Sequence, residues 1–296
     1  MKNHHGKTVY RSKEYSVIDC KLCGFYHLDP LPKLNDLEKM YTHKFYQDLK
    51  PEYIEKDASE LPYWNTTFDD KLDILEQKIR KKQRNILDIG CGPGFFLKRA
   101  QIRGWNVLGI EPSIAAVNYA KKMGIPVIPS ILETAKPLEK NFDVIHSKFL
   151  LEHVRNPKET CELCYQLLNK KGVICFEVPN DFNILQKIVV DKLKKPSYWI
   201  APPQHINYFS LSSLSKLLEK TGFKIFYYEA TFPLEFFLLF GLDYIKNDKV
   251  GRKIHSMRMN MESVLFFANN KLKRDLYHFL AQQGLGREII VYAQKM

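Results

Sequence analysis

The feature that most restricts the fold of this chain is a short apolar run that ends in three closely spaced glycines. Residues 86–89 read Ile-Leu-Asp-Ile, Gly90, Gly92 and Gly94 follow, and a helical pattern covers 95–103. This order predicts a strand, a tight turn and a helix, because glycine permits the positive φ angles that such a turn requires. Glycine also has no Cβ, so a ligand can lie directly on the backbone of the turn.

An acidic residue follows the next apolar run along the chain. Residues 107–110 are apolar and end in Glu111, nineteen positions after Gly92. An acid at the tip of the second strand can accept hydrogen bonds from the two hydroxyl groups of a ribose. The dinucleotide fingerprint requires a further glycine where this chain has Phe95. The spacing therefore disfavours a dinucleotide cofactor such as NAD.

Together, the glycine turn and the acid resemble the class I methyltransferases that depend on S-adenosylmethionine (SAM). In that family the turn packs on the methionine part of SAM and the acid holds its ribose. The resemblance continues at residues 149–154, which contain the Leu-Glu-His sequence common in the family. It implies an enzyme with SAM as its cofactor. The cofactor-binding residues that it implies are Asp88, Gly90, Gly92, Gly94, Glu111, Pro112, Glu133 and Ser147.

The order of strand and helix patterns predicts the fold class. Strands and helices alternate between residues 85 and 178, which indicates parallel strands joined by right-handed crossovers. The resemblance implies an α/β fold: a Rossmann-like, seven-stranded, mostly parallel sheet with helices on both faces, an antiparallel last strand and a helical insertion before it. The predicted division is a cysteine-containing cap segment (1–60), a SAM-binding domain (61–230), a basic helical insertion or lid (231–284) and the final strand (285–296).

The basic charge of the chain is concentrated late in the sequence. The net charge is +12, of which residues 186–196 carry +3 and residues 245–274 carry +6. A basic surface of this kind suits an anionic partner, such as a nucleotide-sugar, a phospholipid surface or a nucleic acid. A solvated helix face would give the same pattern. We expect a small-molecule, anionic acceptor, and the sequence makes no prediction about the oligomeric state.

The chain shows no signal for export or for a membrane span. Residues 1–5 are polar with no apolar segment behind them, and the longest strongly apolar stretch, 236–242, is too short to cross a bilayer. We therefore expect a cytoplasmic protein without an integral membrane segment, and peripheral membrane contact stays open. The six cysteines are expected to be thiols rather than disulfides.

A proline-rich aromatic segment, residues 196–210, is the candidate acceptor site. Its three prolines, two tyrosines and one tryptophan predict a rigid loop that walls a small-molecule pocket. The loop resembles the His-x-x-Tyr-Phe-Ser stretch of methyltransferases that act on sugars, quinones and related metabolites. In the sugar C-methyltransferases a histidine there is the candidate general base, which implies that His205 is catalytic; alternatively, His205 organises the loop. The candidate substrate contacts are Asn180, Tyr198 and Tyr208.

Three functions compete on this sequence. The leading prediction is a SAM-dependent methyltransferase for a small metabolite, most plausibly a sugar, a nucleotide-sugar or another glycoconjugate precursor. The first alternative is a methyltransferase of RNA or other nucleic acid, which the charge would suit. Base aminomethylation usually shows an Asp/Asn-Pro-Pro-aromatic motif where this chain reads His146-Ser-Lys-Phe149, so nucleic acid is a less favoured partner. The second alternative is a non-catalytic SAM-binding scaffold.

A pair of cysteines near the N-terminus has the spacing of half a zinc knuckle. Cys20 and Cys23 are separated by two residues, and His27 follows four residues later. With a histidine from the start of the chain they provide the ligand types of a Cys₂His₂ site. We predict a structural zinc held by Cys20, Cys23, His27 and His5, with His4 as the alternative to His5. The competing interpretation is a degenerate knuckle that binds no metal.

Overall fold

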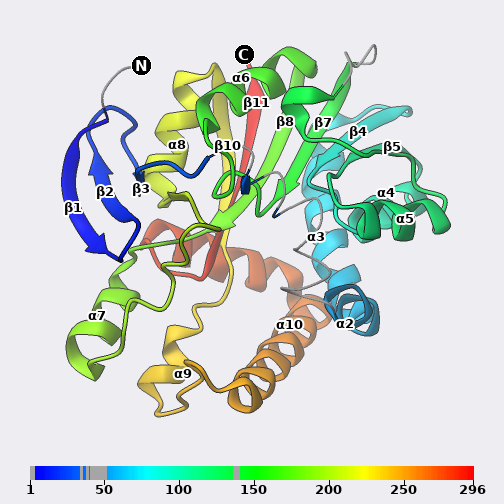
Figure 1. Cartoon of the computed structure of the whole chain (residues 1–296). Coiled ribbons are helices and arrows are strands. Elements are labelled where there is room, and N and C mark those ends of the chain that lie inside the picture. The colour runs from blue at the N-terminus through cyan, green and yellow to red at the C-terminus, as the bar shows by residue number, and fades with distance from the viewer. Residues whose placement is uncertain (1–3, 34–35, 38–39, 41–51, 136–140) are drawn as a thin grey trace. The chain divides into compact units, whose positions relative to one another are not determined.

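The structure of the chain is a computed structural model (Figure 1) that describes residues 4–33, 36–37, 40, 52–135 and 141–296. The chain divides into two compact units. Unit 1 comprises residues 1–31, 177–217 and 227–291, and unit 2 comprises residues 32–176, 218–226 and 292–296. The four-part domain division expected from the sequence stays a prediction.

The larger of two sheets has seven strands in the order β10-β11-β8-β7-β4-β5-β6. Strand β4 pairs in parallel with β5 on one side and with β7 on the other, and β5 pairs in parallel with β6. The strands are β4 (Arg84–Ile89), β5 (Trp105–Ile110), β6 (Val127–Ile128), β7 (Phe142–Lys148), β8 (Leu168–Pro179), β10 (Phe223–Ala230) and β11 (Glu288–Lys295). The predicted Rossmann-like, mostly parallel sheet is confirmed.

The last two strands run in opposite directions. The Thr231 N–H donates to the Glu288 carbonyl at one end of the pair, and the Met296 N–H donates to the Gly222 carbonyl at the other end. Between them the chain makes the long excursion that the sequence predicts. The expected antiparallel last strand and the helical insertion before it are therefore both present.

The central strands form because their side chains are apolar toward both faces. Ile86 and Leu87 are adjacent on β4, so they point to opposite faces, and both are fully buried. A parallel strand that is covered on both faces has this pattern. The helices that flank the sheet (Figure 1) are α3 (Leu61–Ile79), α4 (Phe95–Ile102), α5 (Ile114–Lys122), α6 (Pro157–Leu167) and α8 (Leu211–Lys220), preceded in the chain by α2 (Tyr53–Ser59).

The smaller sheet belongs to unit 1 and joins segments that are distant in the sequence. Its order is β1-β2-β3-β9, with β1 (Gly6–Arg11), β2 (Ser16–Cys20), β3 (Tyr26–Asp29) and β9 (Asn207–Tyr208). Strand β3 pairs antiparallel with β9, so Tyr26 faces Tyr208 and His27 faces Asn207. The sequence analysis did not predict this sheet, which ties the cysteine-containing segment to the aromatic loop.

Helices α7 (Ile184–Leu193), α9 (Glu235–Leu239) and α10 (Asp248–Gln282) also belong to unit 1. Helix α7 begins with a capping box, in which Asn183 accepts from the Gln186 N–H and the Gln186 side chain accepts from the Asn183 N–H. Helix α10 is kinked at Asn269, whose side chain accepts from the Leu272 N–H and so caps the second half. Among the described residues, no helix is both long and apolar enough to span a bilayer.

Candidate functional site

The glycine turn in unit 2 adopts a conformation that depends on glycine. Gly90, Gly92 and Gly94 have φ angles of 73°, 53° and 83°, all in the left-handed region. At Gly94 the backbone is also crowded, because an added Cβ would lie 3.1 Å from the Cβ of Ala120. The Gly90 N–H donates to the carbonyl of Ile110 over 2.8 Å, which fixes the turn to the end of β5. The backbone of the turn is thus held against the end of β5, and residues 91–94 are buried.

The carboxylate of Glu111 is bound to the same turn. One oxygen accepts from the Gly92 N–H at 3.0 Å and the other accepts from the Ser113 N–H at 2.8 Å. The side chain is buried, and burial raises the pKa of Glu111 to about 7; repulsion from Asp88 acts in the same direction, whereas the two N–H groups oppose it. A carboxylate oxygen can accept more than one hydrogen bond. Both oxygens can therefore still accept from ribose hydroxyls.

The carboxylate of Asp88 is paired with a histidine from the neighbouring strand. Asp88 and His146 are register partners on β4 and β7, and Nδ1 of His146 lies 2.7 Å from the Asp88 carboxylate. The His146 ring stacks on Phe96 at 3.9 Å between centroids. Its other nitrogen, Nε2, is buried without a hydrogen-bond partner in the described part of the chain. A buried nitrogen of this kind calls for a ligand or a water molecule.

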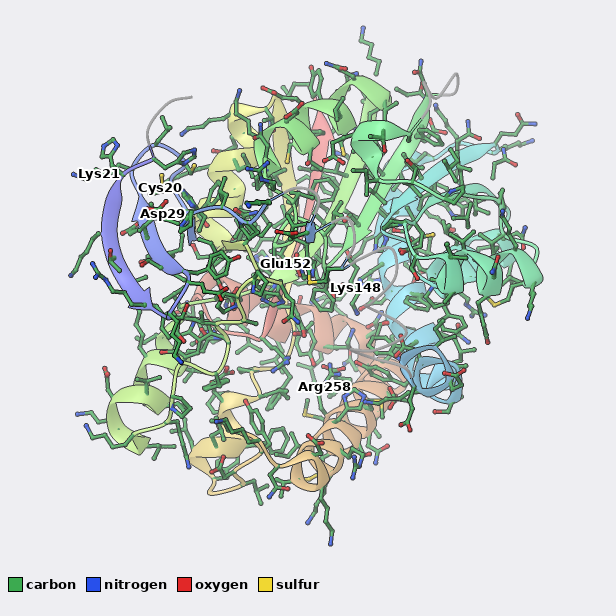
Figure 2. The ribbon with its side chains drawn as sticks, in the orientation of Figure 1. Cys20, Lys21, Asp29, Lys148, Glu152 and Arg258 are labelled. Carbon is green, nitrogen blue, oxygen red and sulfur yellow. The ribbon has the colours of Figure 1, made fainter. Side chains whose placement is uncertain are left out.

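The remaining residues expected at the cofactor differ in exposure. Pro112 is half-buried beside Glu111, and Ser147 is buried at the end of β7. Glu133 is exposed in a short 3-10 turn, η2 (Leu132–Thr134). Lys148, labelled in Figure 2, places its ammonium 4.4 Å from the centre of the Trp64 ring. Sequence reasoning did not single out Phe96 or Trp64, because an aromatic residue in an amphipathic helix carries no functional signal of its own.

A family model described as "Methyltransferase domain" matches residues 63–228. The match covers more than half of the chain. It includes the glycine turn, Glu111 and residues 196–210. The chain belongs to this methyltransferase family. The domain is that of a class I, SAM-dependent methyltransferase, as the sequence predicts.

Two curated relatives of the chain carry the same name. The chain is 30% identical over 118 residues to a ubiquinone biosynthesis O-methyltransferase of Dechloromonas aromatica (strain RCB), which is 37% of this chain and 50% of the relative. A second such enzyme, from Pseudomonas putida (strain W619), is 26% identical over 117 residues, with the same two coverages. The chain spans about half the length of the curated relatives it matches.

Two solved structures share the fold of the methyltransferase. The plantazolicin methyltransferase BamL, solved with S-adenosylhomocysteine (SAH), has a TM-score of 0.56 and 16% identity, covering 88% of this chain and 94% of that one. The plantazolicin methyltransferase BpumL, also with SAH, has a TM-score of 0.53 and 18% identity, covering 88% and 93%. At this identity the likeness is one of fold.

We predict that Glu111→Ala weakens SAM binding by about 1.5–3 kcal/mol, as expected for hydrogen bonds to a charged group. Because burial raises the pKa of Glu111 to about 7, the carboxyl group gains a proton below that pH and accepts ribose hydroxyls less well. SAM affinity of the natural protein should thus fall below about pH 7, whereas Glu111→Gln should remove this dependence. Calorimetry across the pH range measures both effects; equal affinities of natural protein and Glu111→Ala would contradict the ribose assignment.

Residues 196–210, the candidate acceptor loop, contain aromatic side chains that pack on one another within unit 1. The Tyr198 and Trp199 rings lie 5.3 Å apart, and Phe182 contacts both Trp199 and Tyr208. Tyr208 is fully buried on β9. The His205 side chain is half-buried. The backbone N–H of His205 donates to the Ala201 carbonyl at 2.9 Å, which closes a turn before β9.

Of the predicted substrate contacts, Asn180 is already engaged by the backbone. Its amide nitrogen donates to the carbonyls of Gly284 and Gly286, at 3.2 and 3.0 Å. Both N–H groups of the amide are used in this way, so only its oxygen could accept a hydrogen bond from an acceptor molecule. The observed contacts secure the turn that leads into β11.

Two buried carboxyl groups near the loop were not anticipated. Tyr198 donates to Oε1 of Glu235 at 2.9 Å, while Oε2 of Glu235 and Oδ2 of Asp181 have no hydrogen-bond partner in the described part of the chain. Burial raises the pKa of both groups; repulsion from Glu235 adds to the effect on Asp181, and Arg287 opposes it. Glu235 directly precedes the apolar stretch 236–242, and an acid at that position carries no sequence signal for burial.

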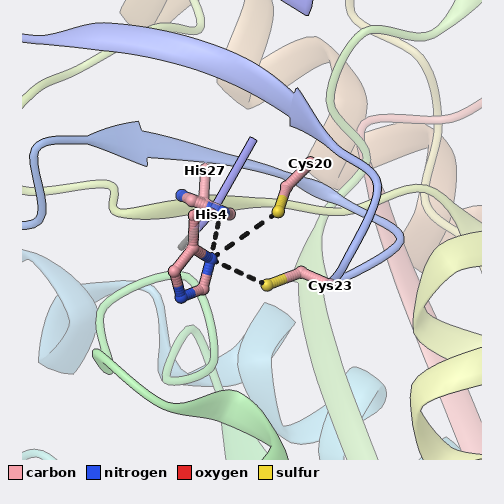
Figure 3. A group of neighbouring side chains, drawn as sticks. All are labelled: His4, Cys20, Cys23 and His27. Atoms are coloured by element: carbon pink, nitrogen blue, oxygen red, sulfur yellow. Dashed lines mark hydrogen bonds between the residues drawn. The ribbon is translucent and has the colours of Figure 1, made fainter. Parts of the chain in front are cut away.

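The cysteine pair forms a compact group with two histidines (Figure 3). Nδ1 of His4 lies 3.6 Å from Sγ of Cys20, 3.4 Å from Sγ of Cys23 and 3.0 Å from Nε2 of His27. All four ligand atoms lie within 4.8 Å of one another. The group contains His4, the alternative to the expected His5, and His5 is not part of it. The other nitrogen of His27 lies 2.8 Å from the Leu28 carbonyl, which fixes the orientation of the ring.

Proposed function

We propose that this methyltransferase transfers the methyl group of SAM to a hydroxyl-rich small metabolite: a sugar, a nucleotide-sugar or another glycoconjugate precursor. The observation that carries the proposal is the pair of buried, incompletely bonded carboxyl groups, Asp181 and Glu235, among the aromatic side chains of the acceptor loop. Buried polar atoms require partners. The hydroxyl groups of a sugar can donate to such oxygens, while Trp199 and Tyr198 offer flat apolar faces to its ring.

The proposal refines the expectation of an anionic acceptor. A phosphate or carboxylate next to Asp181 and Glu235 would be repelled when these groups are ionised, whereas neutral hydroxyls would be bound in either protonation state. We propose that the part of the acceptor that meets these residues is neutral. An anionic portion, such as a diphosphate, would need a different contact surface.

The roles of the residues follow from what methyl transfer needs. The sulfonium of bound SAM supplies an activated methyl group and its own leaving group. The glycine turn and Glu111 are proposed to hold the cofactor, with Asp88, Pro112, Ser147 and Glu133 as further contacts. Tyr198, Tyr208 and Asn180 are proposed to position the acceptor, because alignment of the reacting atoms lowers the barrier of such a displacement. His205 is proposed to take the proton from the acceptor as a general base.

We expect Asp181→Ala and Glu235→Ala each to raise KM for a sugar acceptor by about tenfold or more, the effect of losing one polar pairing. SAM affinity should not change, since neither residue is among the proposed cofactor contacts. The melting temperature of Asp181→Ala should not fall, because its buried Oδ2 lacks a hydrogen-bond partner in the described part of the chain, whereas Glu235→Ala removes the acceptor of the Tyr198 hydroxyl and should lower it. The assay follows labelled methyl groups from SAM into a panel of sugars and nucleotide-sugars.

The matched control is Asp243→Asn, which alters an exposed acid of the same unit. Its KM should equal that of the natural protein. Methylation of RNA in preference to every sugar would overturn the proposed substrate class. Tight SAM binding without any methylated product would support the non-catalytic scaffold instead.

We further propose that His4, Cys20, Cys23 and His27 hold a structural zinc ion. Tetrahedral zinc with bonds of about 2.3 Å to sulfur and about 2.05 Å to nitrogen separates neighbouring ligand atoms by about 3.3–3.8 Å, and a nitrogen from a sulfur by about 3.6 Å. The distances from His4 to the two sulfurs, 3.4 and 3.6 Å, have this length. A single imidazole nitrogen has one site for a proton or a lone pair and cannot bond directly to three neighbours. A cation bound by all four side chains would explain why their ligand atoms lie so close together.

The proposed zinc would support the acceptor loop through the small sheet. His27 lies on β3 and pairs with Asn207 on β9, two residues after His205. Metal binding that orders β2 and β3 would therefore also order β9. A backbone link of this kind gives a structural metal an influence on catalysis without contact with the reacting atoms.

A further inference from the structure

Helix α10 buries charged side chains on its inner face. Arg258 and Glu262 are 8% and 2% exposed, and their side chains form an ion pair with a nitrogen–oxygen distance of 3.2 Å. The Tyr277 hydroxyl donates to Glu262 at 2.6 Å, and the ammonium of Lys273, itself buried, lies 5.3 Å from the centre of the Tyr277 ring. Figure 2 labels Arg258 on this helix. The inner face of α10 is thus held by a polar network rather than by an apolar stripe alone.

The outer face of the same helix carries several large apolar side chains. Val264 and Phe267 are 65% and 76% exposed, and Leu272 and Phe279 on the second half are 54% and 53% exposed. A surface helix of a globular protein normally shows the reverse arrangement, with apolar residues inside and polar residues outside. An exposed aromatic and aliphatic face of this length is typical of a surface that another molecule covers.

Helices α7 and α9 of the same unit share this property. Ile184 at the start of α7 is 57% exposed and Phe240 at the end of α9 is 75% exposed. The two helices contact each other, and Lys195 and Asp243, which follow them, form an ion pair. Of the sixteen large apolar side chains that are exposed in the described part of the chain, eleven lie on α7, α9 or α10, counting Phe240. The three helices lie along the lower part of Figure 1.

The same helices and their connections carry an excess of exposed basic side chains. Within residues 184–195 and 239–282, eight Lys or Arg side chains are exposed against four Asp. The eight are Lys187, Lys192, Lys194, Lys246, Lys249, Arg252, Lys253 and Lys271. This exposed positive charge lies in the two segments where the sequence concentrates it. The surface therefore combines apolar side chains with positive charge.

We propose that α7, α9 and α10 form a surface that docks on an anionic lipid bilayer. A bilayer interface takes up exposed Phe, Leu and Ile side chains into its acyl boundary and attracts Lys and Arg to its phosphate groups. A second copy of the chain would bring like charges together, which opposes self-association through this face. A nucleic acid would neutralise the lysines but would leave the apolar side chains without partners. The bilayer alone satisfies both features.

The test measures binding of the full chain to sedimented vesicles. Vesicles of phosphatidylcholine with phosphatidylglycerol should bind the protein, vesicles of phosphatidylcholine alone should bind it much less, and high salt should release it. Phe267→Ser should lower the partition coefficient by about tenfold, the value of removing one buried aromatic side chain from the interface. The residue is exposed, so the variant should keep the melting temperature and the SAM affinity of the natural protein.

Val264→Ser and Ile102→Ser form a matched pair, because both residues are 65% exposed but Ile102 ends α4 in unit 2. Vesicle binding should weaken for Val264→Ser and stay unchanged for Ile102→Ser. The proposal is overturned if the natural protein does not sediment with anionic vesicles or if both variants bind equally well. It is also overturned if ultracentrifugation shows a dimer that Phe267→Ser dissociates, since a second copy would then cover the surface.

Discussion

His205→Ala is expected to lower turnover by about 10²–10⁴, the usual contribution of a general base. SAM affinity should stay nearly unchanged, because His205 is not among the proposed cofactor contacts. Turnover of the natural protein should also fall toward acidic pH, because a protonated histidine side chain can no longer accept a proton. Rapid-quench measurement of methyl transfer at saturating SAM separates turnover from binding.

Two other results would assign a different role to this histidine. A parallel loss of acceptor binding and turnover, with KM raised and the pH profile unchanged, would show that the side chain of His205 organises the loop. Turnover equal to that of the natural protein would leave catalysis to alignment of the acceptor by Tyr198 and Tyr208. His205→Gln serves as the control, because glutamine retains hydrogen bonding but cannot act as a base near neutral pH.

Removal of the proposed zinc site is expected to have the second large effect. Protein without an affinity tag should contain about one zinc per chain, and Cys20→Ser combined with Cys23→Ser should abolish it. Structural zinc sites bind with apparent free energies of about 10–16 kcal/mol, and this energy is also folding energy. The double variant should therefore lose hydrogen-exchange protection in β1, β2, β3 and β9. Elemental analysis and exchange measured by mass spectrometry follow the two consequences separately.

The two neighbouring histidines provide an internal control for the zinc site. His4→Ala should lower the zinc content, because His4 contacts the other three ligands, whereas His5→Ala should leave it unchanged. A fully folded natural protein without metal would show that the knuckle is degenerate. Loss of zinc from His5→Ala but not from His4→Ala would instead show that His5 is the ligand, as expected from the sequence.

The cofactor-binding half of this protein could be predicted from local patterns in the sequence. A strand that is covered on both faces must be apolar, and a turn with φ angles of 53–83° requires glycine, so both are visible in a short window. The acid at position 111 has a fixed distance from the turn because a single helix separates the two strands. These constraints act over a few tens of residues, and the predicted α/β sheet and SAM dependence follow from them.

Other features depend on residues that are distant in the chain. The pairing of Asp88 with His146 spans 58 positions and arises from strand order. His4 rather than His5 joins the cysteine group because the hairpin brings Nδ1 of His4 to both sulfurs and to His27, and the sequence treats the two adjacent histidines alike. The buried acids Asp181 and Glu235 likewise meet the aromatic loop only in the folded unit.

The helical insertion shows most clearly which contacts the sequence does not predict. The sequence predicts its helices and its basic charge, because propensity and charge are properties of single residues. Which side of α10 is buried was decided by tertiary structure, where Arg258 and Glu262 pair inside and Phe267 is left outside. Sequence alone thus determined the elements and the cofactor class of this methyltransferase. Tertiary packing decided which ligands, acids and faces come together, since those contacts depend on distances that no local pattern encodes.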